Sequence, residues 1–246
     1  MKTLLWTFFA LAALLVPVIA VASVNMDNTT NARIDFGKST ALDSTTGLSI
    51  STWIYFRSYG ANNIARILND GVDGSTGYAF YLNNSGSNTD GLAFLSGADA
   101  SAYFDNNILA TSTWECVGVT FNAASKAVDF YLNGTLKGTS NAVNNLNASG
   151  ADIWVGNSSS NTSRQFDGFI SDLKVWSRTL STQEMRSNCS NFYPVSTQGL
   201  SFWAPLFGTG PVERDFGPAR LVGTTTAAEA PIKNVTSRAP PIYNAW

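Results

Sequence analysis

The chain has 246 residues, of which 44% are hydrophobic and 13% are charged, and its formal net charge is -2. That length suits one large domain with a proper core, and the lack of a basic surplus argues against a nucleic-acid partner. The chain contains no histidine, which excludes Ser-His-Asp and Cys-His catalytic sites and zinc sites built on histidine.

The first 22 residues have the layout of a secretory signal peptide. Lys2 precedes an apolar run over residues 4–16, and small residues at 20–22 offer a cleavage position. We therefore expect cleavage after Ala22, an exported domain over residues 23–246, and no membrane contact once the signal is removed. A retained anchor is the alternative, because residues 4–24 nearly reach the length that spans a bilayer.

The rest of the chain reads as short strands, with apolar residues at every second position and turns rich in Gly, Asn and Asp. Strands are predicted at 24–36 (two strands around a turn), 42–56, 64–68, 78–82, 92–95, 102–105, 114–121, 128–132, 153–156, 166–176, 199–206 and 221–224. Polar loops are predicted at 69–74 and 83–90, and Asn133-Gly134 is typical of a tight hairpin turn. Strands of this size and spacing indicate a sandwich.

Residues 166–187 read as a strand followed by a short capped helical turn near 181–187. Ser181 and Glu184 form a capping box, and Leu180 and Met185 occupy the positions of a hydrophobic staple. Period-two alternation divides the strand into two faces, one with Phe169, Ser171, Leu173 and Val175 and the other with Ile170, Asp172, Lys174 and Trp176.

The order F-x-G-x-I-x-D-x-x-x-W in this stretch resembles the closing strand of laminin-G-like domains. These belong to the concanavalin A-like lectin/glucanase superfamily, which includes pentraxins. The phrases L-S-I-S-T-W-I-Y at 48–55 and W-E-C-V-G-V-T-F at 114–121 resemble further family strands. The resemblance implies an all-β, two-sheet antiparallel jelly roll over nearly the whole mature chain, and it implies binding more often than catalysis.

Export gives the two cysteines a structural meaning. Cys116 and Cys189 are an even pair in an oxidising compartment, so we expect a disulfide, with two separate thiols as the alternative. Eight N-x-S/T triplets are N-glycosylation candidates, unless they arise by chance in an Asn-rich and Ser-rich surface. They begin at Asn28, Asn83, Asn133, Asn147, Asn157, Asn161, Asn188 and Asn234.

Calcium is the metal that the resemblance implies, held by oxygen ligands. Asp70 and Asp73 lie together in a predicted loop, where an ordinary turn is the alternative. Asp172 matches an acidic position of the family motif, but Ser171 stands where many relatives carry a second acid. A solvated strand face is therefore the simpler account of Asp172 and Lys174.

Aromatic side chains are the candidates for sugar contact, because ring faces stack on the apolar side of pyranoses. Tyr59, Tyr103 and Tyr131 lie outside the main apolar face and are predicted ligand-binding residues. Most other aromatics are interpreted as packing residues, among them Trp53, Phe80, Phe130, Trp176 and Phe202.

Catalysis by the chain itself is not expected. A retaining glycosidase places two carboxylates about 5 Å apart. The triplet Glu213-Arg214-Asp215 begins the E-x-D-x-x-E motif of superfamily glucanases, but residues 216–218 do not complete it.

The leading hypothesis is an exported recognition module that binds a glycan or a cell-surface partner through rim loops, with calcium as the one cofactor to test. The alternative is a structural subunit of an extracellular filament, a surface layer or a virus-particle appendage. Such a subunit would contact copies of itself through the proline-containing tail at residues 230–246. A glycosidase is the third hypothesis.

Overall fold

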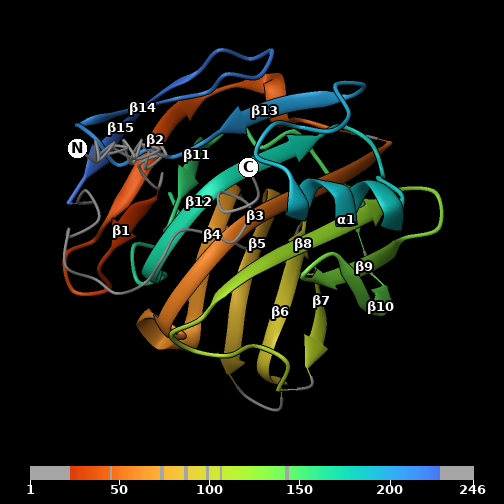
Figure 1. Ribbon diagram of the computed structural model, residues 1–246, viewed down its shortest axis with the longest axis horizontal. Helices are drawn as coiled ribbons and strands as arrows, with labels where there is room; N and C mark the ends of the chain where they lie inside the picture. Colours follow the sequence, from red (N-terminus) through yellow and green to blue (C-terminus); the bar gives the residue numbers. More distant parts are fainter. Residues whose placement is uncertain are drawn as a thin grey trace, which may run out of the picture.

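The computed structural model describes residues 23–227, apart from 45, 73–74, 86–87, 98–99, 106 and 142–143. Two antiparallel sheets pack face to face, and helix α1 (Thr182–Ser190) lies on the outer face of one of them (Figure 1). This confirms the predicted all-β two-sheet sandwich. The predicted signal peptide and the proline-containing tail lie outside the described residues.

The first sheet has the strand order β1-β12-β3-β8-β9-β10, and β13 also pairs with β12. Its strands are β1 (Val24–Met26), β3 (Gly47–Ser58), β8 (Trp114–Asn122), β9 (Ala127–Leu132), β10 (Thr135–Asn141), β12 (Asp167–Trp176) and β13 (Leu200–Ala204). Strands β1 and β13 pair with successive halves of β12, while β3 pairs along its whole length. Strand β12 is therefore a central element of the sheet.

The second sheet has the order β14-β15-β2-β11-β4-β5-β6-β7. Its strands are β2 (Arg33–Lys38), β4 (Ile64–Val72), β5 (Thr76–Ser85), β6 (Asn88–Ser96), β7 (Ala100–Asp105), β11 (Asp152–Val155), β14 (Val212–Arg214) and β15 (Val222–Thr226). Two 3-10 turns, η1 (Thr40–Leu42) and η2 (Ala61–Asn63), precede β3 and β4. The topology brings the turn after β2 next to the segment that enters β11.

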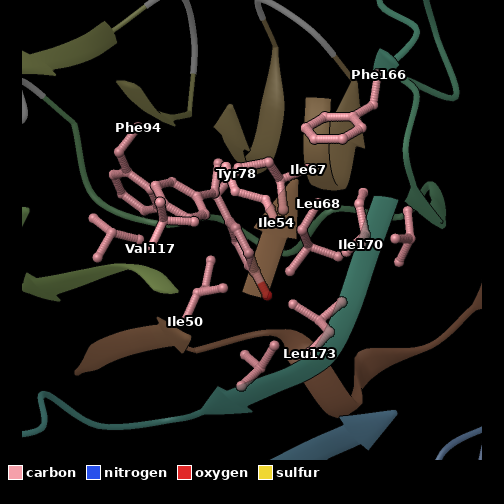
Figure 2. Packing of buried hydrophobic residues seen from close by; sticks show 14 of the residues in the cluster. Ile50, Ile54, Ile67, Leu68, Tyr78, Phe94, Val117, Phe166, Ile170 and Leu173 are labelled. Carbon is pink, nitrogen blue, oxygen red and sulfur yellow. The ribbon is translucent and has the colours of Figure 1, made fainter. Parts of the chain in front are cut away.

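The core lies between the two sheets, where alternate residues of facing strands meet (Figure 2). Ile50 and Ile54 of β3 point toward Leu68 and Tyr78 of the opposite sheet. Phe94 stacks on Tyr78 with a ring-centroid distance of 6.2 Å. Burial of large apolar side chains of this kind is the main stabilising contribution to such a sandwich.

A β-bulge in β12 corrects the predicted strand faces. The register against β3 shifts between Ser171 and Lys174, and Asp172 adopts a φ of 53°. A bulge adds one residue to the strand, so the alternation of faces changes phase across it. The core therefore contains Ile170, Leu173 and Val175, whereas Phe169 and Trp176 pack outside it.

The loops predicted at 69–74 and 83–90 are largely wrong, because β4, β5 and β6 continue through most of them. The Gly, Asn and Asp residues there were interpreted as turn signals. Gly77, just beyond the first of these ranges, permits a close approach of two strands, since a Cβ at this position would lie 1.8 Å from the Asp70 carbonyl oxygen. Its φ of 71° also favours glycine.

Candidate functional site

A hollow of about 380 Å³ lies where β2 ends, between the turn that follows β2 and the segment that enters β11. Its lining combines four residues with polar side chains and two small residues, namely Lys38, Ser39, Thr40, Asp43, Gly150 and Ala151. This volume is within the range of small-molecule pockets in proteins. The hollow lies between two loops, and none of its lining residues was among the predicted ligands.

Short hydrogen bonds hold the walls of the hollow together. The Ser39 hydroxyl accepts from the Ala41 amide at 3.1 Å, which starts the η1 turn. The Asp43 carboxylate accepts from the Ser149 amide at 3.0 Å, and the Thr76 hydroxyl donates to the Ser149 carbonyl at 2.8 Å. The two loops and β5 are thus joined, so the hollow is preformed.

Asp70 lies on β4 opposite Tyr78 and interacts with Ser149 and with Asp43 of the hollow. Its side chain is fully buried, and neither carboxylate oxygen meets a donor within normal hydrogen-bond geometry. Burial is the main reason that the pKa of Asp70 is raised to about 7, with the Ser149 hydroxyl lowering it in part and the Asp43 charge raising it. Asp70 is thus a buried acid whose ionisation is costly.

The predicted calcium ligands Asp70 and Asp73 differ in what the structure describes of them. Asp73 lies outside the described residues, and Asp70 belongs to a buried strand rather than to the predicted loop. Within the described part of the chain, no three His, Cys, Asp or Glu side chains gather as metal ligands. Calcium takes six to eight oxygen ligands, which include backbone carbonyls and waters, so a calcium site at Asp70 stays a prediction.

The three predicted sugar-binding tyrosines occupy different places. Tyr131 is only 2% exposed and lies beneath α1, with its hydroxyl 3.4 Å from that of Thr182, so this prediction was wrong. The helix covers the strand face that the sequence left open. Tyr59 is half-buried and packs edge-on against Phe56, and Tyr103 is half-buried on the outer face of the second sheet.

Burial also removes three of the glycosylation candidates. Asn157 is fully buried and donates to the Asn31 side chain at 2.7 Å, and Asn188 inside α1 is 1% exposed. Asn83 is likewise buried in β5. A glycan on any of the three would displace packed neighbours. Of the remaining candidates, Asn133 and Asn147 are exposed, and Asn28 and Asn161 are half-buried. Asn234 lies outside the described residues.

The outer face of the first sheet is covered by α1. The capping box of Ser181 and Glu184 is present, and α1 extends three residues beyond the predicted turn, to Ser190. The predicted disulfide is also present and joins Cys116 of β8 to Cys189 of α1. The helix is thereby fixed both at its start and near its end.

A buried ion pair lies beside α1, and it corrects the predicted solvated face. Lys174 contacts Asp172 at 2.6 Å, with both side chains 1% exposed. Lys174 also donates to the Asn191 carbonyl at 2.8 Å, and the Trp203 indole donates to Asp172 at 2.9 Å. The β12 bulge turns both charges under the segment after α1, so they connect β12, α1 and β13.

Aromatic rings continue across this face and form what we call the aromatic surface. Its members are Trp53, Trp114, Phe192, Tyr193, Trp203, Phe207 and Phe216. Phe192 and Trp114 are partly buried and pack against the cluster of Trp53, Cys116 and Cys189, and the Phe192 ring centroid lies 5.5 Å from that of Trp203. Tyr193 is 71% exposed and Phe216 is 42% exposed. The sequence did not predict this surface, because its rings come from five separate segments.

The carboxylates that a glycosidase would need hold backbone segments instead. Glu213 accepts from the Phe207 amide at 2.9 Å, and Asp215 accepts from the Trp203 amide at 2.8 Å. Glu184 caps α1, and Glu115 accepts from the Ala110 amide. Every glutamate in the described part of the chain thus has a structural role. No helix among the described residues is long and apolar enough to cross a membrane.

Known structures share this fold at low sequence identity. A Bacteroides ovatus protein described as a candidate carbohydrate-binding protein aligns with a TM-score of 0.62 and 18% identity, over 85% of this chain and 59% of that one. This chain therefore spans less than two thirds of that protein.

Two further structures align over about two thirds of the chain. A heptameric SAP-like pentraxin of Limulus polyphemus has a TM-score of 0.53 and 17% identity, over 68% of this chain and 81% of that one. The Ruminococcus gnavus IT-sialidase CBM40, bound to α2,3 sialyllactose, has a TM-score of 0.50 and 18% identity, over 69% and 94%. At such identities the likeness establishes the fold alone.

The search of curated proteins finds no match. The family model described as the concanavalin A-like lectin/glucanases superfamily, Laminin_G_3, matches residues 28–186. That region contains β2 to β12 and the start of α1, and it is well over half of the chain. The sandwich and the sequence thus agree, and the chain belongs to the concanavalin A-like lectin/glucanases superfamily.

Proposed function

We propose that this chain is an exported, non-catalytic module that recognises a glycan, with residues 23–246 as one domain after removal of residues 1–22. Family membership and the likeness to carbohydrate-binding folds support the proposal. The disulfide supports export, because such bonds persist in oxidising compartments.

The observation that carries the proposal is the preformed hollow at the end of β2, with its polar side chains. It offers the Lys38 ammonium, the Asp43 carboxylate and the hydroxyls of Ser39 and Thr40 within one opening. These groups donate to and accept from neighbouring sugar hydroxyls. A preformed site also loses little conformational freedom on binding.

A glycan array with and without calcium tests the proposal, followed by titration of the best ligand. We expect Lys38→Ala to weaken binding about tenfold, since hydrogen bonds to charged groups contribute about 1.5–3 kcal/mol. Lys137→Ala, at an exposed position of β10 in the other sheet, is the matched control and should bind normally. Silence on every glycan in both conditions, or equal binding by the two variants, would refute the assignment.

The second candidate is a structural subunit of an extracellular assembly. The exposed rings Tyr193 and Phe216 favour it, because contiguous apolar patches often mark contacts between proteins. Light scattering over a range of concentrations separates the two functions. A stable monomer throughout would remove the subunit hypothesis and leave the glycan proposal unaffected.

A further inference from the structure

Four tryptophans on the outer face of the first sheet differ in their hydrogen bonds. The Trp176 indole donates to the Ser196 carbonyl at 2.8 Å, and the Trp203 indole donates to Asp172 at 2.9 Å. The indole nitrogens of Trp53 and Trp114 are buried, but no acceptor faces them among the described residues. Buried donors without acceptors are rare in proteins because they are costly. The pair therefore indicates that another segment supplies acceptors on this face.

The two unpaired donors lie close together. Trp53 and Trp114 are on the adjacent strands β3 and β8, one diagonal position apart in the register. Phe192 and Trp114 both pack against the cluster that contains Trp53, and the exposed rings of Tyr193 and Phe216 continue the aromatic surface outward. The surface thus combines apolar ring faces with two indole N–H groups at its buried end.

This combination suits an extended, proline-containing segment. Polyproline II backbone has no internal hydrogen bonds, so its carbonyls remain available, and proline rings pack against aromatic side chains. A stacked sugar suits the surface less well. The aromatic rings of this surface meet edge-on, so they provide no flat platform for a sugar. The interplanar angle is 73° for Phe192 and Trp203 and 64° for Tyr193 and Trp203.

The chain itself contains such a segment. Residues 230–246 include the three prolines Pro231, Pro240 and Pro241. Near its end this segment also has the apolar side chains of Ile242, Tyr243 and Trp246. The last described strand, β15, ends beside the loop that carries Phe207 and Phe216, since the Thr225 amide donates to the Pro211 carbonyl at 2.9 Å. About 13 residues then precede Pro240, and at roughly 3.1 Å per residue they reach about 40 Å, comparable with the width of a domain of this size.

We propose that residues 230–246 dock on the aromatic surface of their own chain, with backbone carbonyls accepting from the Trp53 and Trp114 indoles. The apolar residues at 242–246 cover the exposed rings. Covalent attachment favours the chain's own segment over that of a second copy, because it places the segment at a high effective concentration. The docking is independent of the hollow at the end of β2.

The test compares the full-length chain with Pro240→Gly/Pro241→Gly, which keeps the length of the tail. Hydrogen exchange of indole N–H groups is followed by NMR with ¹⁵N-labelled tryptophan. We expect exchange at Trp53 and Trp114 to accelerate at least tenfold in the variant. Exchange at Trp176 and Trp203 should stay unchanged, because their acceptors lie within the fold, so these two signals report that the domain is intact.

A second measurement uses a chain that ends at Ala227 and a synthetic peptide of residues 228–246. Addition of the peptide should restore slow exchange at Trp53 and Trp114, and a Trp114→Phe change should weaken peptide binding about fivefold by removing one donor. Unchanged indole exchange in the proline variant, or failure of the peptide to bind, would overturn the proposal. So would light scattering that shows a dimer dependent on the tail, since the occupant would then be a neighbour's segment.

Discussion

Replacement of Asp70 by asparagine should stabilise the protein at neutral pH and leave it unchanged in acid. Asp70 is a fully buried acid on β4 whose oxygens meet no donor of normal geometry. Its folded-state pKa of about 7 is above the ordinary value of 3.8, chiefly because of burial. A carboxyl with a raised pKa stays protonated in the folded state while the unfolded chain has already lost its proton. The contribution to stability is therefore complete below about pH 4 and is lost as pH rises to 7.

The size of the effect follows from the two pKa values. A difference between 3.8 and about 7 corresponds to roughly 4 kcal/mol, since one pKa unit is about 1.4 kcal/mol. Asparagine has almost the same shape and carries no charge, so Asp70→Asn avoids the cost of burying the carboxylate. The gain in unfolding free energy should be near zero at pH 4 and grow to as much as about 4 kcal/mol at pH 8.

Urea denaturation at one-unit steps from pH 4 to 8, in the presence of EDTA, measures this difference. Asp152→Asn, on the neighbouring strand β11 and partly exposed, is the matched control and should show little change. Glu115, whose pKa burial also raises to about 7, adds a separate slope to both proteins and cancels in the comparison. A stability difference that stays constant across the pH range would refute the reasoning, because it would show that Asp70 does not titrate between pH 4 and 8.

Three further predictions concern the outer face of the first sheet. Replacing both Cys116 and Cys189 by alanine should lower the unfolding free energy by about 4 kcal/mol, measured by urea denaturation. This value follows from the chain-entropy relation for a disulfide that joins residues 73 positions apart. Lys174→Met should cost about 3–5 kcal/mol because it leaves Asp172 charged and buried, and addition of Asp172→Asn should recover part of that loss in a double-mutant cycle. Ser181→Ala should lower stability by about 1 kcal/mol in thermal or urea unfolding, because it removes the N-cap of α1.

The parts of the fold that the sequence predicted are those governed by local rules. Alternating residues in β3 separate core from outer face as expected, and the capping box of Ser181 and Glu184 starts α1 where it should. The β12 bulge was not predictable in this way, because Asp172 at a φ of 53° depends on tertiary partners, namely Lys174 and Trp203.

The candidate sites were harder to predict, because they depend on contacts between distant segments. Asp70 was predicted only as a calcium ligand in a loop or as part of an ordinary turn, and its burial follows from pairing with β5 and β11 rather than from its neighbours in sequence. Tyr131 was expected to be open because nothing local shows that α1 covers it. The hollow around Asp43 joins residues more than one hundred positions apart, and no short motif marks it.

The residues beyond the family match give this sandwich features that the matched region lacks. Strand β13 pairs with the half of β12 that β1 leaves free, and β15 pairs with the outer edge of β2. Both additions cover strand edges that would otherwise expose unpaired backbone groups. The same segment supplies Phe192, Trp203 and Phe216, and Asp215 fixes it by accepting from the Trp203 amide. The edge protection and the aromatic surface therefore have one origin, distinct from the hollow at the end of β2, so the two surfaces can be tested and altered independently.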